Sequence, residues 1–283
     1  MDQGTFPSNQ DYRSVNNVET AELYTILEEQ YFGEHMHERE EIERLPDLLH
    51  GVSVFVDVGA SLGQYSFHAN RILQKAAIYC IEADPIRVIR LKQLAEQWQR
   101  SSSNKIAVIH AAAADRNTRT TFYTTDANAS GGLFIHNPEL HNTVEWKAAE
   151  VNCITLDSAF ENLEPDLIKI DVEGAEYRVL QGARSILERG KCRFLVEVHP
   201  WGDKAERKRP SDVFQLFARY GYDAQRTHHH WLFVKTNKRL RLRIRSALIG
   251  FVLNNDWLRT ALKRCAHIPH SMRLRSSRAS RQV

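Results

Sequence analysis

Hydrophobic residues along the chain gather in short apolar runs, separated by segments in which they recur every three or four positions. Runs of this kind predict the strands of a mostly parallel sheet, and the spaced segments predict helices that cover both of its faces. The predicted strands are 52–59, 76–84, 105–114, 119–125, 165–174 and 192–200, followed by an antiparallel hairpin of 222–227 and 230–236. The predicted helices cover 63–74, a segment opened by Pro85, the segment after 174 through Leu187, and 211–220.

The pattern divides the chain into one α/β domain and an extension at each end. Residues 1–50 form an N-terminal extension, polar to about 18 and then helical in pattern with a break near Gly33. Residues 51–236 form the α/β domain, in which 126–145 is predicted to be a long loop. Residues 237–283 form a basic, partly helical tail.

Charge is distributed unevenly along the 283 residues. The formal net charge is +3, but residues 236–283 contribute about +11 and residues 1–235 about −8. The N-terminus lacks the apolar core of a signal peptide, and the apolar run 247–253 is too short to span a bilayer. The four cysteines form no C-x-x-C motif, which favours a reduced, cytoplasmic chain.

The stretch VFVDVGASLGQYSF (54–67) predicts a strand, a tight turn and a helix. Gly59 and Gly63 permit the turn and a close helix approach, and the free N–H groups of the helix face a polar ligand. Asp57 would repel a pyrophosphate, whereas Glu82, at the end of the next strand, can accept both hydroxyls of a ribose. The alternative is an ordinary turn with a solvated Glu82; the two features together favour a nucleoside site.

Five segments then resemble the FkbM-type S-adenosylmethionine-dependent methyltransferases. They are VFVDVGASLGQYSF, IYCIEADPIRVIRLKQL, VNCITLDSAF, DLIKIDVEGAEYRVLQGA and FLVEVHP, in that order, over about residues 40–235. The segment KIDVEGAE after a TLD segment is the specific part, since many methyltransferases share the first turn. The resemblance implies an α/β fold: a Rossmann-like, seven-stranded, mostly parallel sheet with a C-terminal antiparallel hairpin, the class I methyltransferase architecture.

The resemblance also implies a site for S-adenosyl-L-methionine. Its turn residues would lie under the methionine part, Glu82 would bind the ribose, and further residues would flank the adenosine. Ser61 stands where the family often has Asn. The cofactor-binding residues carried over are Asp57, Gly59, Ala60, Gly63, Glu82, Ala83, Asp84, Ala113 and Asp115. Apart from the resemblance, Ser130, in the predicted loop, is expected to contact the cofactor's carboxylate.

Polar residues at two later strand ends are the catalytic candidates, because methyl transfer to a hydroxyl needs a proton acceptor. Strand alternation places Lys169 and Asp171 on one face, and likewise Glu197 and His199. His199 is the first choice of general base, with Asp171 and Glu197 beside it; the alternative is a histidine that only caps its strand.

A divalent cation held by Asp171, Glu173, Glu197 and His199 is a further possibility, but no dedicated metal spacing supports it and no metal is predicted. Glu173 and Glu176 also suit a helix N-terminus without any catalytic role. The run His228–His230 is predicted to be an exposed hairpin end.

The predicted function is O-methylation of a hydroxyl on a sugar, glycan or related secondary metabolite, a substrate class that comes from the resemblance. N-methylation stays open, as do a non-catalytic scaffold in a glycan or membrane assembly and a nucleic-acid methyltransferase. The basic tail can dock on the acidic domain or contact the inner membrane surface peripherally. Nucleic acid is the weaker alternative, because no motif for it is present. The oligomeric state is left undetermined.

Overall fold

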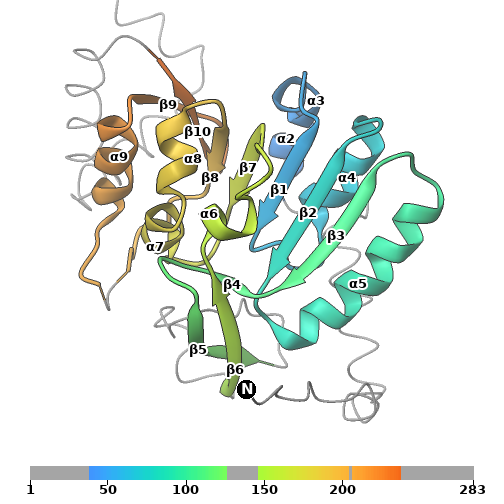
Figure 1. The fold of residues 1–283 in the computed structure, drawn as a ribbon, viewed down its shortest axis with the longest axis horizontal. Coiled ribbons are helices and arrows are strands. Elements are labelled where there is room, and N and C mark those ends of the chain that lie inside the picture. The colour runs from blue at the N-terminus through green and yellow to red at the C-terminus, as the bar shows by residue number, and fades with distance from the viewer. Residues whose placement is uncertain (1–37, 126–145, 204–205, 237–283) are drawn as a thin grey trace, which may run out of the picture.

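The computed structural model describes residues 38–125, 146–203 and 206–236. Its centre is a seven-stranded sheet in the order β3-β2-β1-β7-β8-β10-β9 (Figure 1). β10 is antiparallel to both of its neighbours, and the other pairings are parallel. The strands are β1 (Val54–Val58), β2 (Ala77–Glu82), β3 (Lys105–His110), β7 (Leu167–Ile170), β8 (Arg193–Val196), β9 (Tyr222–Arg226) and β10 (Trp231–Lys235). The predicted α/β architecture with its closing hairpin is confirmed.

Helices cover both faces of this sheet. One face carries α2 (Arg39–Ile42), α3 (Leu45–Leu48), α4 (Gln64–Ile72) and α5 (Pro85–Arg100), and the other carries α6 (Leu156–Ala159), α7 (Glu176–Gln181), α8 (Arg184–Arg189) and α9 (Pro210–Arg219). Successive strand residues point to opposite faces, so Phe55 joins the first core and Val56 the second. Burial on both faces explains why the central strands are apolar throughout.

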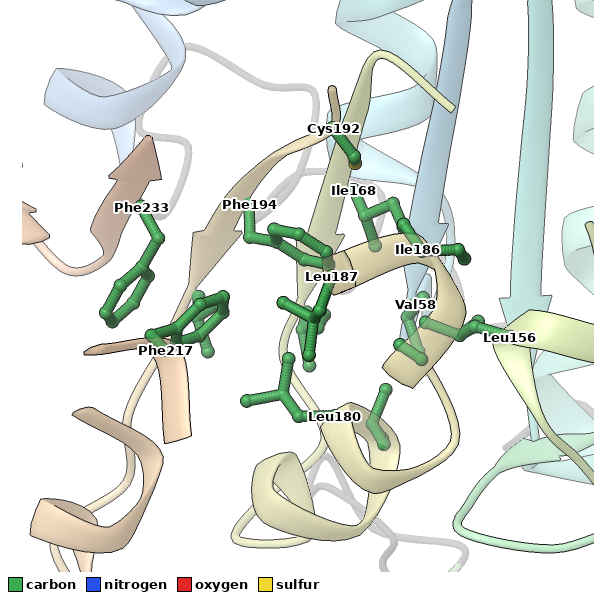
Figure 2. Close-up of a cluster of buried hydrophobic side chains, with 14 of the residues drawn as sticks. Val58, Leu156, Ile168, Leu180, Ile186, Leu187, Cys192, Phe194, Phe217 and Phe233 are labelled. Carbon is green, nitrogen blue, oxygen red and sulfur yellow. The ribbon is translucent and has the colours of Figure 1, made fainter. Parts of the chain in front are cut away.

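The second core is the larger and contains most of the aromatic packing. Side chains from β1, β7, β8, β10 and the covering helices converge there (Figure 2). Phe217 of α9 stacks on Phe233 of β10 with ring centroids 3.7 Å apart, and Phe194 of β8 contacts Phe217 edge-on at 5.3 Å. These contacts fix the hairpin and α9 against the parallel strands.

A second, three-stranded sheet in the order β4-β6-β5 corrects two of the predicted strands. It contains β4 (Ala112–Ala113), β5 (Thr118–Thr125) and β6 (Trp146–Ile154), and lies at one end of the large sheet (Figure 1). The predicted strand 105–114 is therefore two strands, because the chain leaves the large sheet after His110 and pairs with β6. The predicted strand 119–125 belongs to this small sheet, and β6 was not predicted.

The helix predicted through Leu187 is two helices, α7 and α8. It breaks at Gly182, where a Cβ would lie 2.0 Å from the carbonyl oxygen of Ala114. Close contact with the chain after β4 therefore interrupts the helix.

Several features bear on the predictions about location and the chain's ends. Among the described residues no helix is long and apolar enough to cross a membrane. Cys80, Cys153 and Cys192 are buried and free. The predicted N-terminal helices before 38, the loop with Ser130 and the basic tail lie outside the described residues. The domain boundaries stay predictions.

Candidate active site

The turn after β1 is shaped by two glycines with left-handed backbone. Gly59 has φ 73°, and a Cβ there would lie 1.8 Å from the carbonyl oxygen of Asp171. Gly63 has φ 82°, and a Cβ there would lie 2.7 Å from the Leu91 side chain and 2.8 Å from that of Trp98. The first glycine therefore brings β1 and β7 together at the turn, and the second lets α4 pack against α5, as the sequence predicted.

A cavity of about 700 Å³, open mouth included, lies above this turn. Its walls come from the ends of β1, β2 and β7, from the start of the small sheet and from Phe122 of β5. It therefore occupies the carboxyl ends of the parallel strands, where such sheets bind ligands. The predicted site residues that line it are Gly59, Glu82, Ala83, Asp84, Ala113 and Asp171.

Glu82 is a buried carboxylate held by backbone donors. Its Oε2 accepts from the Ser61 N–H at 2.6 Å and its Oε1 from the Asp84 N–H at 2.7 Å. Burial raises the pKa of Glu82, the Asp84 carboxylate adds to the rise, and the two N–H groups oppose it. A carboxylate that is fixed in this way at a cavity wall can accept hydrogen bonds from two adjacent hydroxyl groups.

Asp84 begins α5 and connects the two sheets. Its Oδ1 accepts from the Ile86 N–H at 2.8 Å, a side-chain cap of the helix, and its Oδ2 accepts from the Thr124 hydroxyl at 2.6 Å. Arg87, in the first turn of the helix, donates to the Ser61 Oγ at 2.7 Å. Ser61 is thus itself held in place.

Beneath the turn, Lys169 bridges two carboxylates. Asp57 and Lys169 are paired on neighbouring strands, with Lys169 Nζ 3.5 Å from Asp57 Oδ1 and 3.3 Å from Asp171 Oδ2. Asp57 is fully buried and also accepts from the Ser66 hydroxyl at 2.8 Å. Burial opposes ionisation of Asp171, but Lys169, His199 and His230 together outweigh it, and the pKa of Asp171 is lowered. Asp57 therefore supports the turn from below and does not line the cavity.

His199 lies among carboxylates just beyond the end of β8. Its Nδ1 is 2.6 Å from Glu176 Oε1, and its Nε2 is 3.5 Å from Glu173 Oε2 and 3.8 Å from Asp171 Oδ1. Burial favours the neutral ring, but Glu176, Asp171 and Glu173 outweigh it and raise the pKa of His199 to about 10. An imidazole that is protonated at neutral pH donates a proton and does not accept one. A protonated His199 would have to lose its proton before it could act as the general base that the sequence predicted.

Glu197 completes the group at the end of β8, where its Oε1 lies 3.9 Å from His199 Nε2. Burial and the Asp171 carboxylate raise the pKa of Glu197 to about 8. Its carboxylate forms no hydrogen bond with any described residue. Together Asp171, Glu173, Glu197 and His199 form an acidic group that adjoins the cavity, since Asp171 and Glu173 line its wall.

A family model for the methyltransferase FkbM domain matches residues 57–224 of this chain. The chain belongs to the FkbM methyltransferase family. It has the family and fold of S-adenosylmethionine-dependent methyltransferases, as the resemblance of its motifs implied. A comparison with curated proteins found no match.

Three solved structures are similar to this FkbM chain at low identity. Methyltransferase FkbM from Methylobacillus flagellatus is 17% identical with a TM-score of 0.44; the match covers 76% of this chain and 60% of that one, less than two thirds of its length. Precorrin-6y C5,15-methyltransferase from Geobacter metallireducens is 11% identical over 72% and 91% of the two chains, with a TM-score of 0.42. Fibrillarin from Aeropyrum pernix, with bound S-adenosyl-L-methionine, is 13% identical over 68% and 73%, with a TM-score of 0.36. At these TM-scores they say nothing about the acceptor of this chain.

Four residues predicted to contact the cofactor do not line the cavity. Ala60 and Gly63 belong to the turn, and Asp57 lies beneath it. Asp115 is bound to Arg116, with Oδ2 2.8 Å from Nη2, at the surface beyond β4. The small sheet begins before Asp115 and carries it away from the cavity, which a count of positions after the third strand does not reveal.

His230 corrects the prediction of an exposed hairpin end. His228 and His229 are exposed, but His230 is fully buried, with Nδ1 3.4 Å from the Tyr65 hydroxyl. It lies close to Glu38 and Glu197. Strand β10 begins at the next residue, and alternation places His230 on the same face as Leu232, which packs against the core that contains Tyr65.

Phe122 and Arg87 are cavity residues of this FkbM chain that the sequence analysis missed. Phe122 lies on a strand assigned to the wrong sheet. Arg87 stands in the first turn of a correctly predicted helix, three residues after a capping Asp, which was the available signal. Glu176 was weighed only as a helix-terminal charge, but it binds His199.

Proposed function

We propose that this chain transfers a methyl group from S-adenosyl-L-methionine to a hydroxyl of a sugar, glycan or related metabolite. The supporting observation is the juxtaposition of a cavity around Glu82 with a separate acidic group at its edge. A cavity alone would suit any nucleoside ligand. The adjoining carboxylates and histidine supply the proton acceptor and polar contacts that a hydroxyl acceptor requires.

The residues present fit the cofactor. Gly59 leaves the turn open where any side chain would collide with Asp171, and the buried Glu82 carboxylate would bind the ribose hydroxyls. Ala83, Ala113 and Phe122 would contact the adenine. When bound, the cofactor supplies an activated methyl group, so the protein need not activate it further.

The chain's own residues would orient the acceptor and take its proton. Glu197 is the proton acceptor that we favour, in the ionised form that it takes as the pH rises through its pKa of about 8, because His199 is engaged by Glu176 on one nitrogen and faces carboxylates with the other. Asp171 is held by Lys169 and would position the acceptor at the cavity edge. His199 and Asp171 thus become positioning groups for the hydroxyl, and Glu197 its base.

The cofactor half of the proposal is tested by calorimetric titration with S-adenosyl-L-methionine. Glu82→Ala should abolish measurable binding, since it removes the acceptor of both ribose hydroxyls, whereas Glu96→Ala, an exposed glutamate of α5, should leave binding unchanged. Unchanged binding in Glu82→Ala would disprove the assigned pocket.

The reaction is tested by incubation with methyl-labelled cofactor and fractionated cell extract, followed by mass identification of the product. A methylated hydroxyl on a carbohydrate fraction supports the proposal, and a methylated amine or nucleic acid contradicts it. Glu197→Gln should lower turnover and leave cofactor binding intact. Binding without transfer to any fraction would favour the scaffold alternative.

A further inference from the structure

The arrangement around His199 resembles that of a metal-binding histidine. Histidine ligands usually donate one ring N–H to a carboxylate, which fixes the ring and leaves the other nitrogen for the ion. His199 Nδ1 is 2.6 Å from Glu176 Oε1, and only 6% of the residue is exposed. Its Nε2 lies at ion-pair distances of 3.5–3.9 Å from the carboxylates of Glu173, Asp171 and Glu197. The second nitrogen of a buried, oriented imidazole is thus directed at acidic oxygens.

The oxygens it faces have the spacing of a ligand set. Asp171, Glu173 and His199 each offer one ligand atom, and all three atoms lie within 4.8 Å of one another. Ligand bonds of about 2.1 Å place neighbouring ligand atoms about 3.0–3.5 Å apart. The distances from His199 Nε2, 3.5 Å to Glu173 Oε2 and 3.8 Å to Asp171 Oδ1, need little contraction.

The carboxylates around His199 and the fixed backbone of Glu173 also favour the binding of a cation. Asp171 turns only Oδ2 toward Lys169, at 3.3 Å, which leaves Oδ1 on the histidine side. Glu173, Glu176 and Glu197 add three more carboxylates around the same imidazole. The Trp201 indole donates to the Glu173 carbonyl at 3.2 Å and so holds that residue, whose φ is 53°, in place.

We propose that Asp171 Oδ1, a Glu173 carboxylate oxygen and His199 Nε2 bind one divalent transition-metal ion at the edge of the cofactor cavity. A set of one imidazole and two carboxylates suits Mn²⁺ or a later first-row ion better than Mg²⁺ or Ca²⁺, which prefer oxygen alone. The ion would occupy the place that a proton on Nε2 otherwise takes. That it would bind and acidify an acceptor hydroxyl rests on the proposed function, whereas the binding of the ion does not.

A neighbouring group, Glu38, Glu197 and His230, has comparable spacing and is the competing site. Its histidine is fully buried, and His230 Nε2 has no hydrogen-bond partner among the described residues. Its other nitrogen, however, contacts the Tyr65 hydroxyl at 3.4 Å, and that hydroxyl donates to Glu38 at 2.5 Å. Among the described residues no carboxylate fixes the ring of His230 as Glu176 fixes that of His199, so the first group is favoured.

The test titrates the chelator-treated full chain with Mn²⁺ alone, followed by electron paramagnetic resonance of free Mn²⁺ and by calorimetry. We expect one saturable ion per chain. Glu173→Gln and His199→Gln should each weaken binding at least tenfold, and Glu176→Gln, which only orients the histidine, by about tenfold. His228→Gln is the matched control, because that histidine is exposed on the hairpin, and it should bind as the parent does.

Absence of saturable binding would overturn the proposal, and so would a loss in His230→Gln with none in His199→Gln. Glu173 lies at the cavity wall with 35% of its side chain exposed, so its variant tests the site even where His199→Gln fails to fold. Neither cofactor nor acceptor enters the measurement. Failure here therefore leaves the methyltransferase proposal standing, and unchanged cofactor binding in Glu82→Ala, which would disprove the cofactor pocket, leaves this one standing.

Discussion

The two halves of the site are held together by different forces. In the cofactor half, Glu82 is fixed by two backbone N–H groups and Gly59 by a close approach of two strands. In the acceptor half, Asp171 and His199 are fixed by charged side chains, Lys169 and Glu176, that lie on other elements. Backbone donors survive side-chain changes, whereas a charged pair depends on both partners. Substitutions that change the shape of the site should therefore affect the cofactor half most, and substitutions that remove a charge should affect the acceptor half most.

The largest effect should follow from Lys169→Met, which removes the cation shared by Asp57 and Asp171. Breaking a buried ion pair on one side costs about 3–5 kcal/mol, because it leaves a buried charge uncompensated. Urea unfolding measures the loss, and Lys105→Met, at an exposed strand start, is the control. A loss below about 1 kcal/mol would show that charge does not hold this half together.

Gly59→Ala should have the next largest effect, in the cofactor half. The new Cβ would lie 1.8 Å from the Asp171 carbonyl oxygen, so β1 and β7 must move apart at the turn. We expect loss of cofactor binding in calorimetry and a cost in unfolding free energy of about 2–4 kcal/mol.

Gly51→Ala is the control for the backbone conformation. Gly51 has φ 74°, nearly that of Gly59, but no atom lies within 4 Å of its added Cβ. Its cost should be that of the left-handed backbone alone, about 1–2 kcal/mol. Equal costs in the two variants would mean that the approach to Asp171 does not matter.

The third effect is on the pH dependence of cofactor binding. Burial and Asp84 raise the pKa of Glu82, so this carboxylate gains its proton at a higher pH than an ordinary glutamate. A protonated Glu82 has lost the charge that would bind the ribose hydroxyls. Affinity should therefore fall as the pH falls, beginning above the usual range of glutamate, up to tenfold per pH unit. Glu82→Gln should bind weakly at every pH; an equal slope in that variant would assign the titration to another group.

The contrast between residues fixed by the backbone and residues fixed by charged side chains also explains which parts of the site could be predicted from the sequence. The turn of Gly59 and Gly63, the cavity carboxylate Glu82 and the cap Asp84 follow from short stretches in which each residue's role depends on its neighbours in the chain. The strands β1, β7 and β8 themselves followed from apolar runs, although their order in the sheet did not. Gly182, by contrast, interrupts a helix because of Ala114, a contact that no local pattern contains.

In the acceptor half the residue types were visible but their partners were not. Asp171 and His199 stood out at strand ends, yet the pKa of His199 depends on Glu176 and Glu173, which come from another segment. The run of three histidines was predicted to be an exposed hairpin end, whereas the last of them, His230, is fully buried. Charge environments are set by tertiary contacts, so they could not be predicted from spacing.

The smallest effect should come from Phe122→Leu, which keeps an apolar side chain in the cavity wall and removes only the aromatic ring. Stacking of a base on an aromatic ring contributes about 1–3 kcal/mol, and leucine retains part of that contact. Cofactor affinity should therefore weaken about fivefold in calorimetry. Tyr123→Leu, on the opposite face of β5, should not change it. Mn²⁺ binding should be equal in both variants, because neither residue belongs to the acidic group. A change in Mn²⁺ binding with Phe122→Leu would show that the two halves are coupled and that shape and charge do not act separately.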